Sequence, residues 1–571
     1  MKKLGFQVIL GIILVSVLIL AGCGGSKTTT TTTTAAVTTT PAATKTTAAT
    51  TAAITTTAAP TTTAAPTQTI NKGGTLRIIA GAIPKDLGYD PEKAPSDRFG
   101  MLPVIEHLCE WGPNGGILVP VLATSWETSH ATNTITMHLR QGVKFTDGTP
   151  FNAEAVRWNV QLGIDNRTGS GTNLIDSLEV KDDYTIIYHM KSFDWQTTQN
   201  IGLLQPMSPT SFKTAGGKIS ADSTAAADVE ARKVWARSNC IGTGAFTVSE
   251  WVRDDHITFV KNPNYWSAGK PYVDKLIVTA IADTTVASVK LQAGEADMWS
   301  DTSSMNDILA LKAKNFTLVP GPGMFMVILF SDVDPASPLS KSKVREAIEY
   351  ALDRPTMAKN LGQGLFEPLT QMASSTWPGH VAGYDPRPFN TAKAKQLLAD
   401  AGYPNGFPIK ILASSGGNTN DVMALFTYYL GLVNITVQPD IADLGRYFGA
   451  LFGGAKGGWD GLCFSASGIN PDASDIFVHY GPNPMTFATL NIYKFDAYKA
   501  LCNQAIDPSI STSEQAMPLI QAAVKQAGED ALFLPLWRTY EASVVWPYVH
   551  TEYPKIHGII WHPENDWMDK H

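Results

Sequence analysis

The chain has 571 residues, a formal net charge of −7 and 44% hydrophobic residues. This hydrophobic fraction is enough to build several cores, and the length predicts about three or four compact units. The mild acidity gives no support for a nucleic-acid-binding protein, because phosphate backbones are bound by basic surfaces.

Residues 1–22 are predicted to be a signal peptide. Two lysines precede an apolar run over residues 6–21, which is shorter than the ~20 residues that a membrane-spanning helix needs. The run ends in Leu-Ala-Gly-Cys, which resembles a lipobox, so we expect cleavage before Cys23 and a lipid on its thiol. An ordinary secretory signal with an incidental cysteine is the alternative. A lipid anchor would hold the mature protein on the outer face of the cell membrane, the periplasmic side if the cell has two membranes.

Residues 23–72 are predicted to be a disordered stalk that follows the lipidated cysteine. From residue 26 to about 68 the stalk is almost entirely Thr, Ala and Pro. Such a segment cannot bury enough apolar surface to offset its chain entropy. The folded part is expected to begin near Gly73.

The stretch over residues 133–161 carries the clearest local pattern in the folded part. Apolar and polar residues alternate from 134 to 140, which predicts a strand with one buried face. An Asp-Gly pair at 147–148 marks a tight turn. Asn152 stands where a helix N-cap belongs, so the stretch is predicted to run strand, turn, capped helix.

Residues 343–354 are predicted to form a helix with one buried face, because apolar residues recur at helical spacing. Pro355 disfavours further helix at the residue before it. The Asp-Arg pair that ends this segment is interpreted as structural rather than catalytic. A later helix is predicted to be capped by Thr391 and to end before Gly402, a residue type favoured just past a helix C-terminus.

Together these patterns resemble the signature of the family 5 extracellular solute-binding proteins, the oligopeptide-, dipeptide- and nickel-type receptors of ABC importers. The central match is LRQGVKFTDGTPFNAEAV, preceded by Leu-Ala-Thr-Ser-Trp. The other matches are VIEHL at 104–108, GTGAF at 242–246, NPNYW at 262–266, LQAGEAD at 291–297, VREAIEYALDR at 344–354 and AGYPNGF at 401–407. The resemblance covers roughly residues 73–550.

The resemblance implies an α/β fold, bilobal and periplasmic-binding-protein-like of type II (cluster C), with three domains of mixed sheets flanked by helices. The expected core domain of lobe I combines residues 73–99, 236–322 and 528–571. Residues 100–235 would be a domain inserted in lobe I, and residues 323–527 would form lobe II.

The resemblance also implies the function, a receptor that captures a peptide-like or other small solute by closure of its two lobes. The expected partners are the solute and the permease subunits of an ABC importer, and we expect a monomer without cofactor. A surface sensor that imports nothing is one alternative. A receptor for nickel or another metal chelate is a second, with His380 or His479 as candidate ligands.

The loop after the second lobe's Trp-Asp strand is expected to face the solute. The acid that peptide receptors commonly place there is missing, because Gly468 and Ile469 stand near its position. This departure argues against a free peptide, whose buried ammonium would stay uncompensated. The candidate solute-binding residues are Tyr89, Trp377, Phe464, Ser465, Ser467, Asn470 and Asp472.

No sequence pattern nominates catalytic chemistry, so the chain is predicted not to be an enzyme. There is no GxSxG, HExxH or CxxC spacing. Beside Cys23, four cysteines remain, and their three possible disulfide pairings stay open: Cys109, Cys240, Cys463 and Cys502.

Overall fold

A computed structural model gives the structure of the chain from residue 70 onward, and residues 70–571 form one compact unit. The described residues are 70–93, 97, 100–112, 118–168, 171–321, 323–331, 334–416, 418–453, 459, 461–467, 495–510, 512–551, 553 and 561–569. The predicted signal peptide, Cys23, the stalk up to residue 69, Asn470, Asp472 and His479 lie outside this set.

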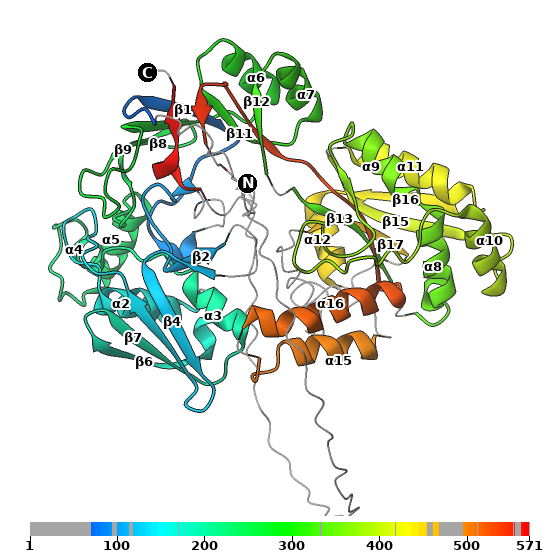
Figure 1. Cartoon of the computed structure of the whole chain (residues 1–571), viewed down its shortest axis with the longest axis horizontal. Helices are drawn as coiled ribbons and strands as arrows, with labels where there is room; N and C mark the ends of the chain where they lie inside the picture. The colour runs from blue at the N-terminus through cyan, green and yellow to red at the C-terminus, as the bar shows by residue number, and fades with distance from the viewer. Residues whose placement is uncertain are drawn as a thin grey trace, which may run out of the picture. The chain divides into compact units, whose positions relative to one another are not determined.

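A seven-stranded sheet is assembled from three distant parts of the chain, in the order β12-β19-β11-β1-β10-β9-β8 (Figure 1). Its strands are β1 (Thr75–Ala80), β8 (Phe246–Val252), β9 (His256–Lys261), β10 (Lys275–Ala280), β11 (Met298–Thr302), β12 (Thr317–Pro320) and β19 (Ala542–Val545). Helices α6 (Thr284–Gln292) and α7 (Met305–Ala313) lie beside it, and their buried residues join Trp299 of β11 in one apolar cluster.

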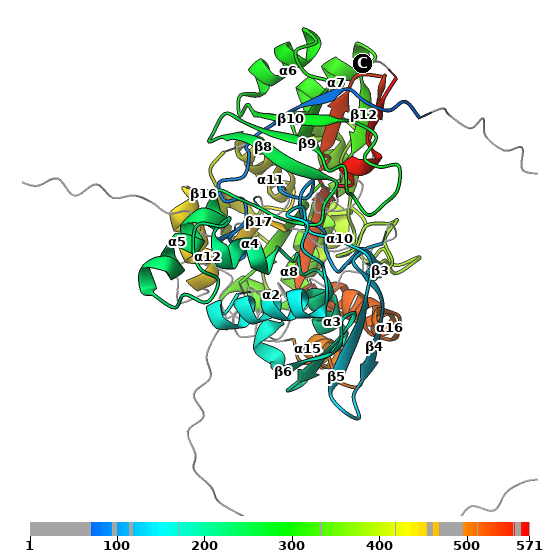
Figure 2. The same ribbon diagram turned by 90° about the vertical axis from the view of Figure 1, so that its left-hand side faces the viewer.

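A four-stranded antiparallel sheet occupies the sequence between β1 and β8, in the order β4-β5-β7-β6. Its strands are β4 (Ala123–Ser129), β5 (Thr134–Leu139), β6 (Ile175–Asp182) and β7 (Thr185–Met190). Helix α2 (Ala153–Asn166) packs on β6 and β7 (Figure 2). The predicted alternation of β5 is confirmed by its burial pattern, and Asn152 accepts a hydrogen bond from Ala155 N at 2.9 Å as the predicted cap.

The remaining elements of this part are short. They are α3 (Trp195–Gly202), α4 (Pro209–Thr214), α5 (Ala226–Arg237), the 3-10 turns η1 (Asp90–Glu92) and η2 (Thr172–Leu174), and the strand pair β2 (Cys109–Trp111) and β3 (Leu118–Pro120). Near the C-terminus come η5 (Pro563–Asn565) and the strand pair β20 (Val549–His550) and β21 (Trp567–Met568).

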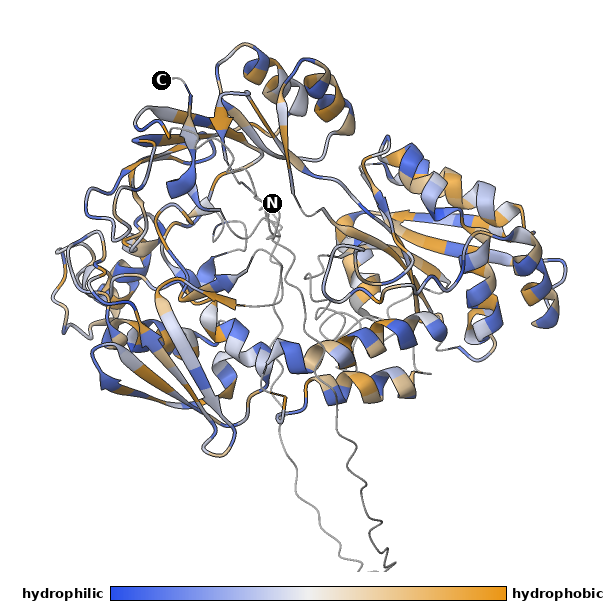
Figure 3. Ribbon diagram, viewed as in Figure 1, coloured by the Kyte–Doolittle hydropathy of each residue, from blue (hydrophilic) through white to orange (hydrophobic). Residues whose placement is uncertain are grey.

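A six-stranded mixed sheet forms the second large body, in the order β14-β18-β13-β17-β15-β16. Its strands are β13 (Phe325–Phe330), β14 (Glu367–Pro368), β15 (Pro408–Ser414), β16 (Thr436–Ala442), β17 (Leu462–Ser467) and β18 (Phe533–Arg538). Figure 3 shows hydrophobic residues concentrated along these strands. Because β13 is buried on both faces, helices must cover both sides of this sheet.

Two helical layers supply that cover. Residues of one layer share an apolar cluster with Ile328 of β13; its helices are α8 (Ser342–Ala351), α9 (Arg354–Leu361), α10 (Thr391–Asp400) and α11 (Thr419–Gly431), with η3 (Pro338–Ser340). The other layer shares a cluster with Val327; its helices are α12 (Leu444–Gly453), α15 (Asp496–Ala505) and α16 (Ser513–Glu529). Adjacent residues of β13 thus point to opposite layers, as strand geometry requires.

Two helix starts differ from the sequence predictions by a small and explicable amount. Asn390, not Thr391, caps α10, since its side chain accepts from Lys393 N at 2.9 Å. Pro355 opens α9 at its first turn, where its missing N–H costs nothing. Gly402 follows α10 with a φ of +92°, as predicted.

The chain connects the seven-stranded and six-stranded sheets through two segments, residues 320–325 and residues 538–542, which we call the hinge. The first joins β12 to β13 and the second joins β18 to β19. The predicted boundary at residue 528 therefore moves to the second hinge segment. The reason is that β18, which follows residue 528, pairs with β13 of the six-stranded sheet.

The carboxylate of Glu106 accepts hydrogen bonds from residues of two other sequence motifs in the first half of the chain. It accepts hydrogen bonds from Thr243 Oγ1 at 2.7 Å, Tyr265 Oη at 2.8 Å and Trp266 Nε1 at 3.0 Å. The guanidinium of Arg140 lies 4.3 Å from the centroid of the Trp266 ring. Residues of the motifs VIEHL, LRQGVKF, GTGAF and NPNYW therefore meet in one partly buried polar cluster.

This cluster makes stability depend on pH. Burial raises the pKa of Glu106 to about 7, although the hydrogen bonds from its three donors act to lower it. Because the folded state then binds the proton more tightly than the unfolded state, the free energy of unfolding rises as the pH falls below about 8. The shift from 4.5 to about 7 corresponds to at most about 3 kcal/mol. We expect Glu106→Gln to lose this gain, so that its melting temperature falls further below that of the wild type at pH 5 than at pH 8.

Calorimetry at the two pH values measures this difference. Burial also raises the pKa of Asp566 to about 7. Asp566 is present in both proteins, so its contribution to the pH dependence cancels when their melting temperatures are compared. Glu514→Gln, a change of an exposed glutamate, is the control and should keep the wild-type pH dependence. If the melting temperatures of Glu106→Gln and the wild type differ by the same amount at both pH values, Glu106 is not the source of the pH dependence.

Candidate functional site

The carboxyl ends of three parallel strands, β15, β16 and β17, meet the hinge at one edge of the six-stranded sheet. Phe325 at the start of β13 pairs with Ser467 at the end of β17, and Arg538 at the end of β18 pairs with Phe325 from the other side. The N-termini of α11 and α12 follow β15 and β16 at this edge. In open α/β sheets this is the edge where ligands bind.

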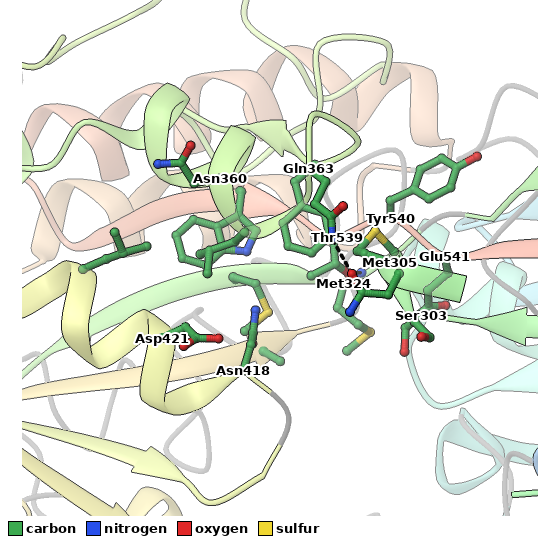
Figure 4. A pocket seen from close by; sticks show the side chains of 18 of the residues that line it. Ser303, Met305, Met324, Asn360, Gln363, Asn418, Asp421, Thr539, Tyr540 and Glu541 are labelled. Atoms are coloured by element: carbon green, nitrogen blue, oxygen red, sulfur yellow. Dashed lines mark hydrogen bonds between the residues drawn. The ribbon is translucent and has the colours of Figure 1, made fainter. Parts of the chain in front are cut away.

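A pocket of about 1060 Å³ lies at this edge (Figure 4). It is large enough for a ligand of several hundred daltons. Its described lining comes from α7 and the residues before it, both hinge segments, the end of α9, the first turns of α11, and β17. The members are residues 303–306, Met324, Met326, Asn360, Leu361, Gln363, Phe366, Asn418, Asp421, Ala424, Leu425, Phe464, Ala466, Trp537 and residues 539–541.

The pocket is therefore built by both large sheets. Residues 303–306 belong to the body of the seven-stranded sheet, whereas α9, α11 and β17 belong to the six-stranded one. One hydrogen bond spans the two bodies at its rim, since Gln363 Nε2 donates to Asn306 Oδ1 at 2.8 Å. A ligand in this pocket would contact both bodies at once.

The two hinge segments form one wall of the pocket and are hydrogen-bonded to each other. Thr539 N donates to Met324 O at 2.8 Å, and Met324 N donates to Thr539 Oγ1 at 2.7 Å. A third bond joins Gly321 N to Glu541 O at 2.8 Å. We therefore expect the two segments to move together. A rotation of one sheet relative to the other would then shift this wall of the pocket.

An aromatic and ionic cluster stands at the same strand ends. Arg538 Nε lies 2.9 Å from Glu367 Oε2, and its guanidinium is 5.3 Å from the ring centroid of Trp377. The Trp377 ring is 5.0 Å from that of Phe325. Although burial acts to raise the pKa of Glu367, hydrogen bonds from Ser375 and Ser374 and the charge of Arg538 hold it below its ordinary value.

The residues predicted on β17 are divided between the two faces of the sheet. Phe464 lines the pocket and packs 6.1 Å, centroid to centroid, from Trp537. Ser465 is the next residue, 3% exposed, so it lies on the other face. Ser467 ends β17 opposite Phe325, and Asn470 and Asp472 lie outside the described residues.

The two predicted aromatic walls lie in different places. Trp377 is half-buried in the cluster with Arg538, beside the strand ends that carry the pocket. Tyr89 is 2% exposed and stacks 6.2 Å from Phe212 in a separate apolar cluster, with its hydroxyl 3.3 Å from Asn166 Oδ1. Tyr89 is thus not among the described residues that line the pocket, and a ligand role for it remains a prediction.

Most pocket residues were missed by the sequence analysis. Asn306, Gln363, Asn418 and Asp421 lie at helix ends, where polar residues are common for local reasons. Met324 and Met326 offered a better signal in the sequence, since two methionines at alternate positions directly after Gly-Pro-Gly suggest an adaptable surface.

Metal ligation finds no support in the part of the chain that the structure describes. No group of three or more His, Cys, Asp or Glu residues there could hold an ion. The alternative ligand His380 has its Nδ1 3.4 Å from Ala373 O. The four cysteines from Cys109 onward are buried and free. Among the described helices, none is both long and apolar enough to cross a bilayer.

The two-sheet architecture with a pocket at the hinge, shared with the solved structures described below, is a bilobal periplasmic-binding-protein-like fold of type II (cluster C). The chain belongs to the bacterial extracellular solute-binding proteins, family 5, whose model for the middle region matches residues 118–483. Members are extracytoplasmic receptors that deliver solutes to ABC importers, so the chain is a receptor and not an enzyme.

Two curated relatives are glutathione-binding proteins GsiB. That of Shigella dysenteriae is 28% identical over 425 residues, which cover 73% of this chain and 80% of the relative. That of Escherichia coli K12 is 31% identical over 327 residues, which cover 57% of this chain and 61% of the relative.

Solved structures share the fold at low identity. HbpA2 of Haemophilus parasuis has a TM-score of 0.75 at 19% identity and covers 87% of this chain and all of its own. NikA of Brucella suis in complex with Fe(III)-EDTA has a TM-score of 0.72 at 20% identity, with coverages of 87% and 100%. DppA of Helicobacter pylori in complex with the peptide STSA has a TM-score of 0.66 at 22% identity, with coverages of 88% and 99%.

The close approach of the hinge segments predicts the effect of a single methyl group. Gly323 has a φ of +64°, and a Cβ there would stand 1.8 Å from Thr539 O. We expect Gly323→Ala to break the bond between Thr539 and Met324, lower the melting temperature by several degrees and weaken solute binding at least ~10-fold. Calorimetry and titration with any bound solute measure both quantities.

Gly142→Ala is the matched control for this change. Gly142 also has a positive φ, +77°, but a Cβ there would meet nothing within 4 Å, and Gly142 is not among the residues that line the pocket. It carries the backbone strain without the collision, so its effect should be near 1 kcal/mol of stability with unchanged solute affinity. Equal losses of affinity in both variants would show that the hinge contact is not the cause.

Proposed function

We propose that this protein is a lipid-anchored surface receptor that captures a peptide-like solute between its two lobes and passes it to an ABC-type import permease. The observation that carries the proposal is the pocket, because residues from both sheets and both hinge segments line it. A solute held there gains contacts from both bodies only when they stand as they do in this structure. Binding therefore favours that arrangement over a more open one, by no more than the difference in affinity between the two.

The chemistry of the pocket supports a peptide-like solute. Asn306, Asn360, Gln363 and Asn418 offer amide groups that can both donate and accept hydrogen bonds, as a peptide backbone does. Trp537 and Phe464 provide an apolar wall for a side chain. The GsiB relatives are named for glutathione, itself peptide-like, and DppA was solved with a tetrapeptide.

The anchor belongs to the same proposal, since it would keep the receptor near the permease. The lipobox-like Leu-Ala-Gly-Cys segment and the Thr-rich residues after it support an anchored, tethered receptor. Mass spectrometry of the mature N-terminus is the check, and a diacylglyceryl group on Cys23 is the expected result.

Solute-induced compaction tests the receptor function. We would combine thermal shift and small-angle scattering on the purified protein with short peptides, glutathione, opines, sugars and metal chelates. A true solute at 100 times its Kd should stabilise the fold by ~2.7 kcal/mol and reduce the radius of gyration. Loss of uptake of that solute on deletion of the receptor would separate an importer from a sensor. Binding without any change of shape would contradict closure.

A buried tryptophan far along the sequence from the pocket residues links the two lobes. Trp195, the first residue of α3, is 2% exposed, and its Nε1 donates to Ala505 O of α15 at 2.9 Å. Its side chain belongs to the same apolar cluster as Tyr498 and Phe325. If the lobes separate when the solute leaves, this contact exists only in the closed arrangement.

We therefore expect Trp195→Ala to weaken solute binding at least ~10-fold while the melting temperature without solute changes little. Titration calorimetry gives the affinity and scanning calorimetry the melting temperature. Trp158→Ala is the control, because Trp158 packs on Phe212 within one lobe and should affect only stability. A large loss of solute-free stability with unchanged affinity would show that Trp195 is permanently packed.

A further inference from the structure

The connection between α9 and β14 reaches from one large body to the other. It comprises residues 362–366, Gly-Gln-Gly-Leu-Phe, which we call the clasp. Both α9 and β14 belong to the body of the six-stranded sheet, and Figure 1 shows α9 and α7 on opposite sides of the hinge. Leu365 and Phe366 nevertheless pack against the apolar cluster of the other body, which includes Met305 of α7. The clasp therefore contacts both lobes at the pocket.

Phe366 differs from the other residues that line the pocket. Of the lining residues that the structure describes, Phe366 alone packs against apolar clusters of both lobes, one containing Ile328 of β13 and the other Trp299 of β11. Its side chain is half-buried, and a Cβ at Gly362 would collide with its ring. The ring thus joins the two cores, and separation of the lobes at this point would withdraw it from one of them.

A hydrogen bond accompanies this apolar contact at the rim of the pocket. Gln363 Nε2 donates to Asn306 Oδ1 of α7 at 2.8 Å. Gln363 has a φ of +50°, in the left-handed region that residues with a long side chain rarely adopt. Such strained conformations persist where surrounding contacts compensate their cost, and they are concentrated at binding sites. Here the strained residue is the one that bridges the two lobes.

The clasp is held firmly on its own lobe. Gly362 N donates to Ala358 O and Gly364 N donates to Lys359 O, each at 2.9 Å, so that the hydrogen bonding of α9 continues into the turn. Leu365 N donates to Gly362 O at 2.8 Å. Because the turn is tied to α9, its contacts with the other lobe depend on the angle between the lobes.

We propose that the clasp holds the two lobes at the angle seen here and slows the departure of a bound solute, with Phe366 and Gln363 as positioning residues. This inference rests on the proposed function and adds the contacts that keep the same pocket closed. An exposed hydrogen bond and a half-buried ring are each weak enough to break, as release of a solute requires. A solute that contacts both lobes favours the same angle and therefore stabilises the clasp.

The solute-free protein gives the first test. Gln363→Ala and Phe366→Ala should each shift the protein toward more separated lobes, so that small-angle scattering on the full-length variants gives a larger radius of gyration than for the wild type. Gln363 is exposed, so its variant keeps the test decisive if Phe366→Ala does not fold. Wild-type radii for the folded clasp variants would overturn the proposal.

Phe389→Ala is the control for Phe366→Ala. Phe389 is 41% exposed, its ring lies 5.7 Å from that of Tyr429 in the same lobe, and it does not line the pocket. This variant should keep the wild-type radius of gyration. An equal increase in both phenylalanine variants would show that the loss of any partly buried ring has this effect, and would overturn the role of Phe366.

A combination of variants tests whether the two amides act on each other. Asn306→Ala and Gln363→Ala remove the same hydrogen bond, so the double variant should have the radius of gyration of either single variant. Asn306→Asp combined with Gln363→Lys replaces the hydrogen bond by an ion pair and should restore the wild-type radius. Additive effects without this rescue would show that the amides do not form the clasp.

The dissociation rate of a bound probe is the second readout. The probes are glutathione and the tetrapeptide Ser-Thr-Ser-Ala, followed by stopped-flow tryptophan fluorescence. For a probe that binds the wild type, we expect Gln363→Ala to raise the dissociation rate about 5-fold and Phe366→Ala ~10-fold or more, with association rates changed less than about 2-fold. Unchanged dissociation rates would overturn the proposal.

The outcomes separate the clasp from the receptor function. If neither probe binds, the scattering comparison of the solute-free variants decides the proposal by itself. Failure of the clasp variants to change radius or dissociation rate leaves the receptor function standing. The proposed function fails separately, if no solute of the wider panel compacts the wild-type protein.

Discussion

The hydrogen-bonded pairing of the two hinge segments is the constraint on which the rest of the structure depends. Thr539, Met324, Gly321 and Glu541 join these segments by three hydrogen bonds, and Gly323 lets the backbones approach too closely for any Cβ. The same residues, except the two glycines, line the pocket. The joint between the lobes and the candidate site therefore share one wall, and the proposed function follows from that shared wall.

The two hinge segments alone would leave one lobe free to rotate relative to the other. A second contact between the lobes, away from the hinge, limits this rotation. Trp195 supplies it, with a buried hydrogen bond to Ala505 and an apolar surround from the six-stranded sheet's own cluster. The hinge segments are covalent connections between the lobes, whereas the contact of Trp195 is noncovalent and can break and form again. In the proposed mechanism, closure would be a balance between solute contacts at the hinge and side-chain packing at α3 and α15.

Much of the fold was predictable because its motifs encode local geometry. The alternation in β5, the Asn152 cap and the glycine after α10 each follow from backbone rules that hold within a few residues. The family motifs of the first half of the chain also have a structural reason. Their residues Thr243, Tyr265 and Trp266 all donate hydrogen bonds to the Glu106 carboxylate.

The site was harder to predict, because its residues come from segments that only the tertiary structure brings together. Met305, Gln363, Asp421 and Thr539 are separated by dozens of residues, and each has an ordinary local reason to be where it is. On β17 the prediction chose neighbouring residues, but strand alternation sends Phe464 and Ser465 to opposite faces. Sequence order cannot resolve a contact that depends on which face is covered.

Two carboxylates illustrate why the family could be recognised before the solute. Glu106 is surrounded by donors from Thr243, Tyr265 and Trp266, so its bonding capacity is filled by the protein itself. Asp421 is exposed, and no described residue pairs with its charge. The first kind of residue is tied to the fold by contacts within the protein. The second is not tied to the fold by a described partner, so the motifs that identify the family carry no information about the solute.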